Sequence, residues 1–469
     1  MLKKLFVAFT LFSWVCPARS QTVPQELAEK LQARLDSVYA ARPYKAGLSA
    51  AIYLPDGALW TGAAGVSHIN ERTPVTPDHK FRLYSSTKPV TAALVLRLVS
   101  DGLISLEDSL SKFLPWIDTV PNLRGDVTVA QLLSHETGFN DYTNNLAFQI
   151  HIIANYDTVW APENIVQHCE APWFAPGQNR RYSSTNYILL GMIAEKVMNM
   201  PAADAFRQNF FEPLGLSEMY LSDGSEPAGT LAGPHDNLKD FGLTPDSITY
   251  LPFSYRGITT GAWTTGAVVS TARNLALWGR RLWGGNALPV QARSLMLNSL
   301  PPYGSVHPFN PERTVDDDFP GYGVFHEWAT MEGFVGHGGA SIGYRSVYAH
   351  HPEKNISIAI CTNQGKGDLS NAARQLMKVV YDHLGLEYTG RAAAFAPALS
   401  VYPNPADGAF RVEATEPVNI SVHDLAGRVV FEQSKTLGAQ ISPLAPGMYF
   451  VRAVSGNGGA ATQRVVVGR

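Results

Sequence analysis

Cysteine is scarce in this chain, which has only 3 in 469 residues. A small disulfide-stapled fold is therefore excluded, because such folds need several cysteine pairs. An excess of one charge is also lacking, since 37 Lys and Arg stand against 40 Asp and Glu, which argues against nucleic-acid binding. Apart from the N-terminus, no apolar run approaches a membrane-spanning length, so we expect no transmembrane segment. The sequence leaves open whether Cys169 and Cys361 pair.

The first twenty residues differ from the rest of the chain. Lys3 and Lys4 precede an apolar core from Leu5 to Val15, and the small residues Ala18 and Ser20 follow. A basic start, a short apolar core and small residues are typical of a secretory signal peptide. We therefore expect residues 1–20 to be cleaved off after export.

Hydrophobic spacing divides the mature chain into two parts. Helical spacing over Pro24–Ala41, a hairpin around the turn "PDG" and strand-like segments before a last helix predict an α+β domain over 21–388. Strands from both ends of this domain should meet in one antiparallel sheet. Residues 389–400 are expected to be a linker, and 401–469, where short strands alternate with turn residues, a small β-sandwich.

One candidate nucleophile stands at the head of "SSTKPVTAALVLRLV". Ser85 precedes Lys88 by three residues, and Pro89 falls in the first helical turn, where a missing N–H costs little. Ser85 should therefore lie at a helix N-terminus with Lys88 beside it, which suits an oxyanion and an activated hydroxyl. An ordinary N-cap serine is the alternative. The same spacing recurs at Ser109 and Lys112, where we predict no helix to orient the pair.

Further motifs follow in order along the chain. "RYSSTNYILLG" places Tyr182 at a loop-to-helix junction, and "GHGGASIGYRS" places His337 and two glycines beside a probable strand. With "LLSHETGF" and "GAVVSTARNLALWGRRL", these motifs resemble the serine β-lactamase and penicillin-binding family, in its class C and D-alanyl-D-alanine carboxypeptidase branch. The resemblance runs from about Gln25 to Leu386.

The resemblance implies a helical domain packed on an antiparallel sheet, with the site between them. Ser85 would attack a carbonyl and form an acyl-enzyme, while Lys88 and Tyr182 would carry the protons. Lys88 would lower the pKa of Tyr182 so that the phenol works as a base. The backbone N–H groups of Ser85 and Ala340 would form the oxyanion hole. His135, in "LLSHETGF", is expected only to shape the loop near the site.

Two positions depart from the family's pattern. The Tyr-x-Asn triplet ends in Ser184, and Lys-Thr-Gly is His337-Gly338-Gly339. These four residues are the expected substrate-binding set. We expect His337 to titrate near pH 6.5 and to bind a substrate carboxylate when protonated. Relatives with histidine at this position look more like esterases and D-aminopeptidases than β-lactamases.

The expected activity is therefore that of a secreted serine hydrolase that cleaves an ester or amide, with D-amino-acid peptides and small esters as leading substrates. One alternative is a β-lactamase or D-alanyl-D-alanine carboxypeptidase. Another is a non-catalytic surface binding protein of the same fold. No cofactor is expected, and no zinc site, because "SHETG" lacks the second histidine of the zinc motif.

The last part of the chain resembles a second family. "VYPNPADGAFRV", "ISVHDLAGRVV" and "LAPGMYFVRAV" are similar to the C-terminal sorting domain of type IX secretion cargo. This resemblance implies that the type IX secretion machinery is a partner. It also implies passage through the outer membrane, followed by release or surface attachment.

Overall fold

The computed structural model describes residues 21–42, 45–225, 231–237, 248–251, 254–315, 319–326, 333–367, 369–387, 399–407, 409–424, 428–441, 444–455 and 460–468. The expected signal peptide and most of the expected linker lie outside these described residues.

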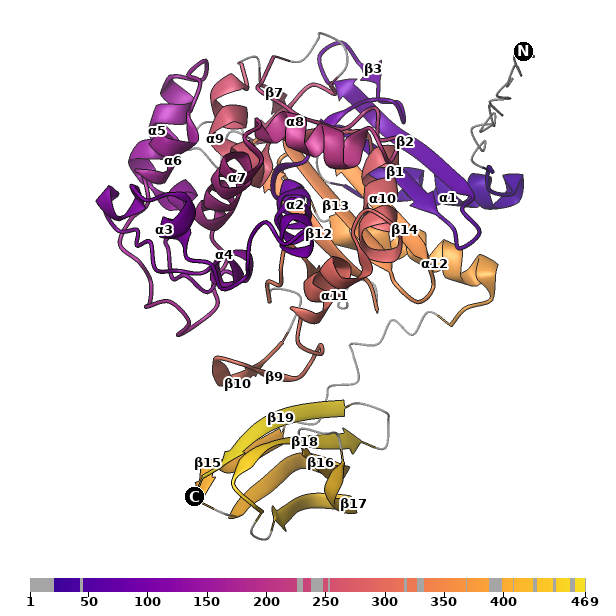
Figure 1. Ribbon diagram of the computed structural model, residues 1–469. Coiled ribbons are helices and arrows are strands. Elements are labelled where there is room, and N and C mark those ends of the chain that lie inside the picture. The colour runs from indigo at the N-terminus through magenta and orange to yellow at the C-terminus, as the bar shows by residue number, and fades with distance from the viewer. Residues whose placement is uncertain are drawn as a thin grey trace, which may run out of the picture.

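A seven-stranded antiparallel sheet organises the larger part of the chain (Figure 1). Its order is β11-β12-β13-β14-β1-β2-β3, so the first strand pairs with the last strand of this part. The strands are β1 (Gly47–Tyr53), β2 (Leu59–His68), β3 (Thr73–Pro74), β11 (Phe325–His326), β12 (Val335–Ser341), β13 (Tyr344–His351) and β14 (Ile356–Thr362). In the register of β1 and β14, Leu48 faces Thr362. The prediction that the sheet joins both ends is confirmed.

Two helices cover one face of this sheet, α1 (Gln25–Ala40) and α12 (Leu369–Leu384). The buried side chains of α1 follow a spacing of three and four residues, which keeps them on one face: Leu27, Leu31, Leu35 and Val38. They form a core with alternate residues of β1 and β14. The predicted N-terminal and C-terminal helices are both present.

The other face of the sheet carries the remaining helices and a larger core. These helices are α2 (Lys88–Ser100), α3 (Leu110–Phe113), α4 (Val129–Leu133), α5 (Leu146–Ala154), α6 (Pro162–Val166), α7 (Ser184–Met198), α8 (Ala202–Phe206), α9 (Arg256–Gly266), α10 (Ala272–Gly279) and α11 (Val290–Asn298). A small sheet of β4 (Phe81–Arg82), β8 (Val268–Ser270) and β5 (Tyr220–Leu221) lies among them, and β6 (His235–Asn237) pairs with β7 (Ile248–Tyr250) and β9 (Val306–His307) with β10 (Asn310–Thr314).

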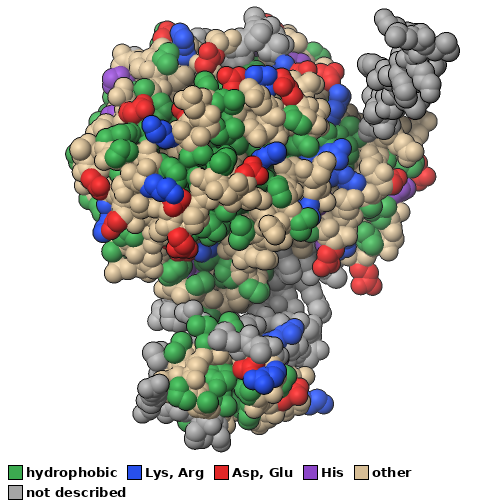
Figure 2. Space-filling view, viewed as in Figure 1, with side chains coloured by type: hydrophobic (Ala, Val, Ile, Leu, Met, Phe, Trp, Pro, Cys, Tyr) green, Lys and Arg blue, Asp and Glu red, His purple; other side chains and the backbone are tan. Residues whose placement is uncertain are grey.

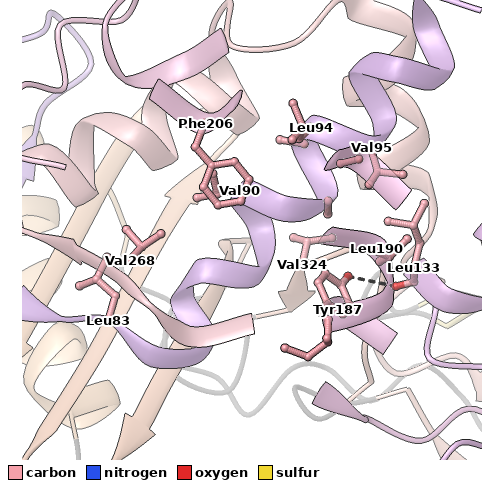
Figure 3. Packing of buried hydrophobic residues seen from close by; sticks show 14 of the residues in the cluster. Leu83, Val90, Leu94, Val95, Leu133, Tyr187, Leu190, Phe206, Val268 and Val324 are labelled. Atoms are coloured by element: carbon pink, nitrogen blue, oxygen red, sulfur yellow. Dashed lines mark hydrogen bonds between the residues drawn. The ribbon is translucent and has the colours of Figure 1, made fainter. Parts of the chain in front are cut away.

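Helix α2 lies in the middle of this core. Val90, Leu94 and Val95 pack among side chains from several other elements, including Tyr187 of α7 (Figure 3). The Tyr187 hydroxyl donates a hydrogen bond to the Leu133 carbonyl at 3.1 Å, the dashed line of Figure 3. A helix buried on all sides keeps its first turn rigid, and that turn carries the candidate nucleophile.

The C-terminal part is all-β, as predicted. Its strands are β15 (Leu399–Asp407), β16 (Ala409–Asp424), β17 (Val429–Ile441), β18 (Gly447–Ser455) and β19 (Ala460–Val467). They form one sheet in the order β15-β19-β18-β16-β17, and β15 also pairs with β16, which curls the sheet around its own core. The boundaries predicted for the domains remain predictions.

Two expectations need correction or completion. Ser109 precedes a short helix, α3, where no helix was predicted. Cys169 and Cys361 are both buried and unpaired, so the question of a disulfide between them is settled.

The surface charge and the helix lengths are consistent with the expectations drawn from the sequence. Positive and negative side chains are mixed over the face shown in Figure 2. Among the described residues, no helix is both long and apolar enough to cross a membrane.

Candidate active site

Ser85 lies in a short 3-10 turn, Tyr84–Thr87, that leads directly into α2. Tyr84 has φ of 47°, a left-handed conformation that is costly for an aromatic residue and persists only where surrounding contacts enforce it. One such contact is the hydrogen bond from the Tyr84 hydroxyl to the Ile342 carbonyl at 2.8 Å. Ser85 itself stays partly exposed.

Strands β12 and β13 hold this turn in place. The Ser346 hydroxyl donates to the Leu83 carbonyl at 2.8 Å and lies 2.9 Å from the Ser86 hydroxyl. A side chain at Gly339 would overlap the Leu83 carbonyl oxygen, so only glycine allows β12 to approach this closely. The close approach brings the edge of the sheet next to Ser85.

Lys88 is the buried partner of Ser85. Its Nζ lies 3.1 Å from the Ser85 hydroxyl oxygen and donates to the Thr265 carbonyl at 3.2 Å. The side chain is 0% exposed, and burial lowers the Lys88 pKa to about 7, against an opposing effect of the negative charge of Asp141. A substantial fraction of Lys88 is therefore a neutral amine at neutral pH, and that form accepts a proton.

A kink in α9 supplies the acceptor for Lys88. Trp263 has φ of 35° inside this helix, which interrupts its regular hydrogen bonding. The carbonyls that follow turn to α2: Thr264 accepts from the Thr91 hydroxyl at 2.5 Å, and Thr265 accepts from Lys88. The kink thus keeps a buried amine hydrogen-bonded, although no carboxylate of the described residues forms an ion pair with it.

Tyr182 immediately precedes the Ser183 cap of α7. Its ring centroid lies 4.7 Å from the Lys88 Nζ. Burial raises the pKa of Tyr182, while a hydrogen bond with Ser85 opposes the rise. The expectation that Lys88 lowers the Tyr182 pKa is wrong, because Lys88 has itself lost most of its charge at the pH where a phenol ionises.

His337 is 3% exposed, which overturns the expectation that it titrates near pH 6.5. Burial, together with the positive charge of Lys88, lowers its pKa to about 3. Its Nδ1 lies 2.6 Å from the Gly338 carbonyl, so Nδ1 carries the proton. The Phe325 ring packs against it in a T-shaped arrangement, with ring centroids 4.9 Å apart. His337 is neutral at physiological pH and supplies no cation for a carboxylate.

Two chambers meet at Ser85, Tyr182 and Ala340. The first, of about 630 Å³, is also lined by His337, Gly338, Gly339 and Arg345. The second, of about 530 Å³, is walled by Tyr142, Phe148, Ile152, Ile258 and Ile342 and also contains Asp141 and Ser184. Together with Lys88, the structure brings all the predicted site residues to one place.

Asp141 is the site residue that sequence reasoning missed. Its carboxylate accepts hydrogen bonds from the Ser184 N–H at 2.8 Å, the Thr143 N–H at 3.0 Å and the Thr143 hydroxyl at 2.7 Å. The residue is 7% exposed and lines the second chamber. It follows "LLSHETGFN", but a single aspartate in a loop carries no sequence signal of its own.

The second serine–lysine pair is arranged differently. The Lys112 Nζ donates a hydrogen bond to the Asp108 carboxylate at 2.7 Å, and the Lys112 side chain is 53% exposed. The Ser109 hydroxyl lies 3.3 Å from the Ser111 hydroxyl. Neither Ser109 nor Lys112 lines either chamber at Ser85.

The arrangement around Ser85 is that of a candidate serine hydrolase site, and comparison with known proteins identifies the family. Residues 35–381 match the beta-lactamase family model, so the chain belongs to the beta-lactamase family of serine hydrolases, esterases and amidases. Residues 400–468 match the secretion system C-terminal sorting domain, which implies type IX secretion to the cell surface or outside.

Individual relatives cover different parts of the chain. It is 27% identical to penicillin-binding protein 4 of Amycolatopsis lactamdurans over 68% of this chain and 81% of that one. It is 30% identical to esterase EstB of Burkholderia gladioli over 41% of this chain and 52% of the esterase. A penicillin-binding protein of Bacillus subtilis (strain 168) is 31% identical, but the chain spans only 34% of its length.

Solved structures show the same fold. A D-stereospecific amidohydrolase from Streptomyces sp. superimposes with a TM-score of 0.61 at 26% identity, over 79% of this chain and 100% of that one. The D-amino acid amidase from Ochrobactrum anthropi SV3 has a TM-score of 0.65 at 23% identity, over 76% and 99%.

Proposed function

We propose that this protein hydrolyses an ester or amide through an acyl-enzyme on Ser85. The observation that carries the proposal is the 3.1 Å contact between the Ser85 hydroxyl and a fully buried Lys88 whose pKa is about 7. An amine with this pKa is well matched to take a proton at neutral pH. In the first step the Ser85 proton passes to Lys88 Nζ while the Ser85 oxygen bonds to the substrate carbonyl carbon.

The tetrahedral intermediate needs support for its negative oxygen. The N–H groups of Ser85, in the turn before α2, and Ala340, on β12, are the proposed donors. Collapse of the intermediate breaks the bond to the leaving group, which takes a proton from the Tyr182 hydroxyl or from protonated Lys88. A protonated Tyr182 suits this role, since its raised pKa keeps the phenol neutral. Water then attacks the acyl-enzyme and gives a proton to whichever of Lys88 and Tyr182 protonated the leaving group. The bond between the acyl group and the Ser85 oxygen breaks, and Ser85 takes a proton back from protonated Lys88.

The substrate class follows from the second chamber. Its walls are mostly apolar. The buried Asp141 carboxylate accepts hydrogen bonds from neutral donors, and no described cation lies within ion-pairing distance of it. A substrate ammonium group there would be well placed to compensate this charge. We therefore favour amino-acid amides, esters or short peptides with a free amine and an apolar side chain. The similar structures include a D-stereospecific amidohydrolase and a D-amino acid amidase, which supports D-amino-acid substrates.

A labelling experiment tests the nucleophile. A fluorophosphonate probe should add one phosphonyl group to the full chain, and digestion followed by mass spectrometry should place it on the peptide that contains Ser85. An adduct on Ser109 contradicts the assignment. No adduct at all, with the fold intact, favours a non-catalytic binding protein.

Asp141→Asn tests the substrate class. We expect the KM of D-phenylalanine amide to rise about 10-fold or more, since a charge-assisted contact is lost. The KM of the N-acetylated analogue, which has no ammonium group, should stay unchanged. Equal effects on the two substrates would contradict an ammonium site at Asp141.

A β-lactamase or D-alanyl-D-alanine carboxypeptidase is the less favoured alternative. Both act on substrates that carry a carboxylate, and neutral, buried His337 offers that group no positive charge. Rapid turnover of penicillin by the unmodified protein would favour this alternative over the amidase or esterase.

We also propose that export begins with removal of residues 1–20 by signal peptidase. The basic start and short apolar core support it. N-terminal sequencing of the secreted protein should begin after Ser20.

A further inference from the structure

We propose that His135 is a positioning residue that fixes the place of Tyr182 in the site. The inference rests on the proposed function, in which Tyr182 transfers protons. His135 comes from the loop after α4, and it lines neither of the two chambers at Ser85. Any effect it has on the reaction must therefore pass through another residue.

His135 accepts hydrogen bonds from the residues on both sides of Tyr182. The His135 carbonyl accepts the N–H of Arg181 at 3.0 Å. Its Nδ1 accepts the N–H of Ser183 at 3.0 Å. The residues before and after Tyr182 are thus held by a single residue, which leaves the Tyr182 backbone little freedom to move.

Ring stacking holds the Tyr182 side chain as well. The His135 ring lies between two tyrosine rings, with its centroid 4.6 Å from that of Tyr182 and 5.0 Å from that of Tyr187. Interplanar angles of 28° and 26° show that both contacts are stacked. Tyr187 is itself anchored in the core through its bond to Leu133, so the stack ties Tyr182 to α7 and α4.

The backbone of His135 is strained in a way that this role explains. Its φ is 61°, in the left-handed region, and the residue is 1% exposed. This conformation directs the carbonyl to Arg181 while the ring reaches Ser183. Strained residues persist only where the surroundings enforce them, and they gather at functional sites.

The ring nitrogen works as an acceptor, which requires an unprotonated Nδ1. Burial lowers the pKa of His135 well below its ordinary value, and the charge of Lys88 adds to the effect. Asn186 supports the same nitrogen, since its Nδ2 lies 3.4 Å away. His135 thus contributes a hydrogen-bond acceptor and a stacking ring, and different substitutions can remove one and keep the other.

Two variants separate these two contributions. His135→Asn keeps an acceptor near Nδ1 and tolerates the left-handed backbone, but has no ring. His135→Phe keeps a ring but leaves the Ser183 N–H without its partner. We expect His135→Asn to lower kcat by about 10-fold or less, and His135→Phe by about 10- to 100-fold, each with KM little changed.

A double-mutant cycle with Tyr182→Phe makes the test specific. If His135 acts by placing the Tyr182 hydroxyl, the His135 substitutions should have almost no further effect on kcat when that hydroxyl is absent. If the His135 substitutions lower kcat by the same factor with and without the Tyr182 hydroxyl, the proposal is overturned, because a general structural role does not depend on that hydroxyl.

His235→Asn is the matched control. His235 is also fully buried, its Nε2 accepts the Ile69 N–H at 3.0 Å, and its ring contacts Tyr250 with centroids 5.7 Å apart. It lines neither chamber at Ser85. This variant should lower the melting temperature, and its effect on kcat should be the same with and without Tyr182→Phe. A coupling in kcat as strong as that of the His135 variants would overturn the proposal.

Labelling of Ser85 distinguishes failure of this inference from failure of the proposed function. If the probe labels Ser85 and Tyr182→Phe slows turnover, but neither His135 variant does, only the positioning role is wrong. If Ser85 is not labelled at all, the proposed function is wrong.

Discussion

Two serine–lysine pairs with the same spacing stand 24 residues apart in this chain, and only one is built into a site. Ser85 leads into a helix buried on all sides, and Lys88 behind it is fully buried. Ser109 precedes a four-residue helix without a capping hydrogen bond, and Lys112 is 53% exposed and forms an ion pair with Asp108. Removal of the lysine from water, rather than the spacing, is what lowers the lysine pKa and fits such a pair for the proposed roles of nucleophile and base.

The largest expected effect is on the nucleophile itself. Ser85→Ala should lower kcat by about 10,000-fold or more and abolish phosphonylation, because no other hydroxyl contacts the Lys88 Nζ among the described residues. Ser109→Ala is the matched control and should keep full activity. A Ser85→Ala protein that still turns over substrate at the parent rate would place the chemistry elsewhere.

The next largest effect is the loss of the proposed base, Lys88. Lys88→Met should slow acylation by about 1,000-fold, whereas Lys112→Met should leave it unchanged. In the parent protein the acylation rate should fall with decreasing pH below about 7, since the ammonium form of Lys88 cannot accept the Ser85 proton. Stopped-flow measurement with an ester probe from pH 5 to 11 checks this. A rate that keeps rising above pH 9 would point to a Tyr182 phenolate instead.

Replacing His337 with a cationic residue should have a moderate effect on substrate binding. His337→Lys should improve the KM for substrates with a carboxylate by about 10-fold and leave neutral esters unaffected, through a new charge-assisted contact. In the parent, KM for both kinds of substrate should not vary with protonation of His337 between pH 5 and 8, because its pKa is about 3. A KM for carboxylates that rises steeply near pH 6.5 would show that His337 is protonated after all.

Burial of basic groups should also appear as acid sensitivity. Burial lowers the pKa of His337 and His350 to about 3 and that of His235 to about 4. The unfolded chain therefore binds more protons than the folded protein below pH 6.5. Each such histidine should cost the folded state about 1.4 kcal/mol per pH unit as the pH falls from 6.5 towards its folded pKa.

Urea unfolding at pH 7, 6 and 5 measures this loss of unfolding free energy. His337→Gln, which has no group that titrates in this range, should reduce the slope. A slope that is unchanged in the variant would show that other groups cause the acid sensitivity.

The smallest expected effect on catalysis is that of the C-terminal sheet. Removing residues after Ala396 should leave kcat and KM within about twofold, since the sheet has its own core and contributes no residue to the chambers. The truncated protein should accumulate in the periplasm instead of reaching the medium or the surface. Loss of activity from a folded truncated protein would contradict the predicted division of the chain.

Much of the fold could be predicted from local patterns. The spacing of Leu27, Leu31 and Leu35 marks α1, and the turn between β1 and β2 is visible as "PDG". Ser85 could be placed before α2 because Pro89 tolerates only the first helical turn. Each of these signals lies within a few residues of the element that it predicts.

The electrostatics of the site could not be predicted in the same way. The pKa values of Tyr182 and His337 depend on burial under Phe325 and neighbouring elements, which no local pattern encodes. Asp141 acquires its place because Ser184, 43 residues later, donates to it. The short helix after Ser109 was missed because four residues show no period.

The hydrogen bond from the Ser346 hydroxyl to the Leu83 carbonyl joins residues 263 positions apart. The strained turn at Tyr84 therefore lacks its support until β12 and β13 have docked, and such distant contacts form late in folding. A chain that is still being synthesised, or is passing unfolded through a membrane, carries Ser85 as an ordinary, unreactive alcohol. On the proposed function, catalytic latency before folding is thus a by-product of topology.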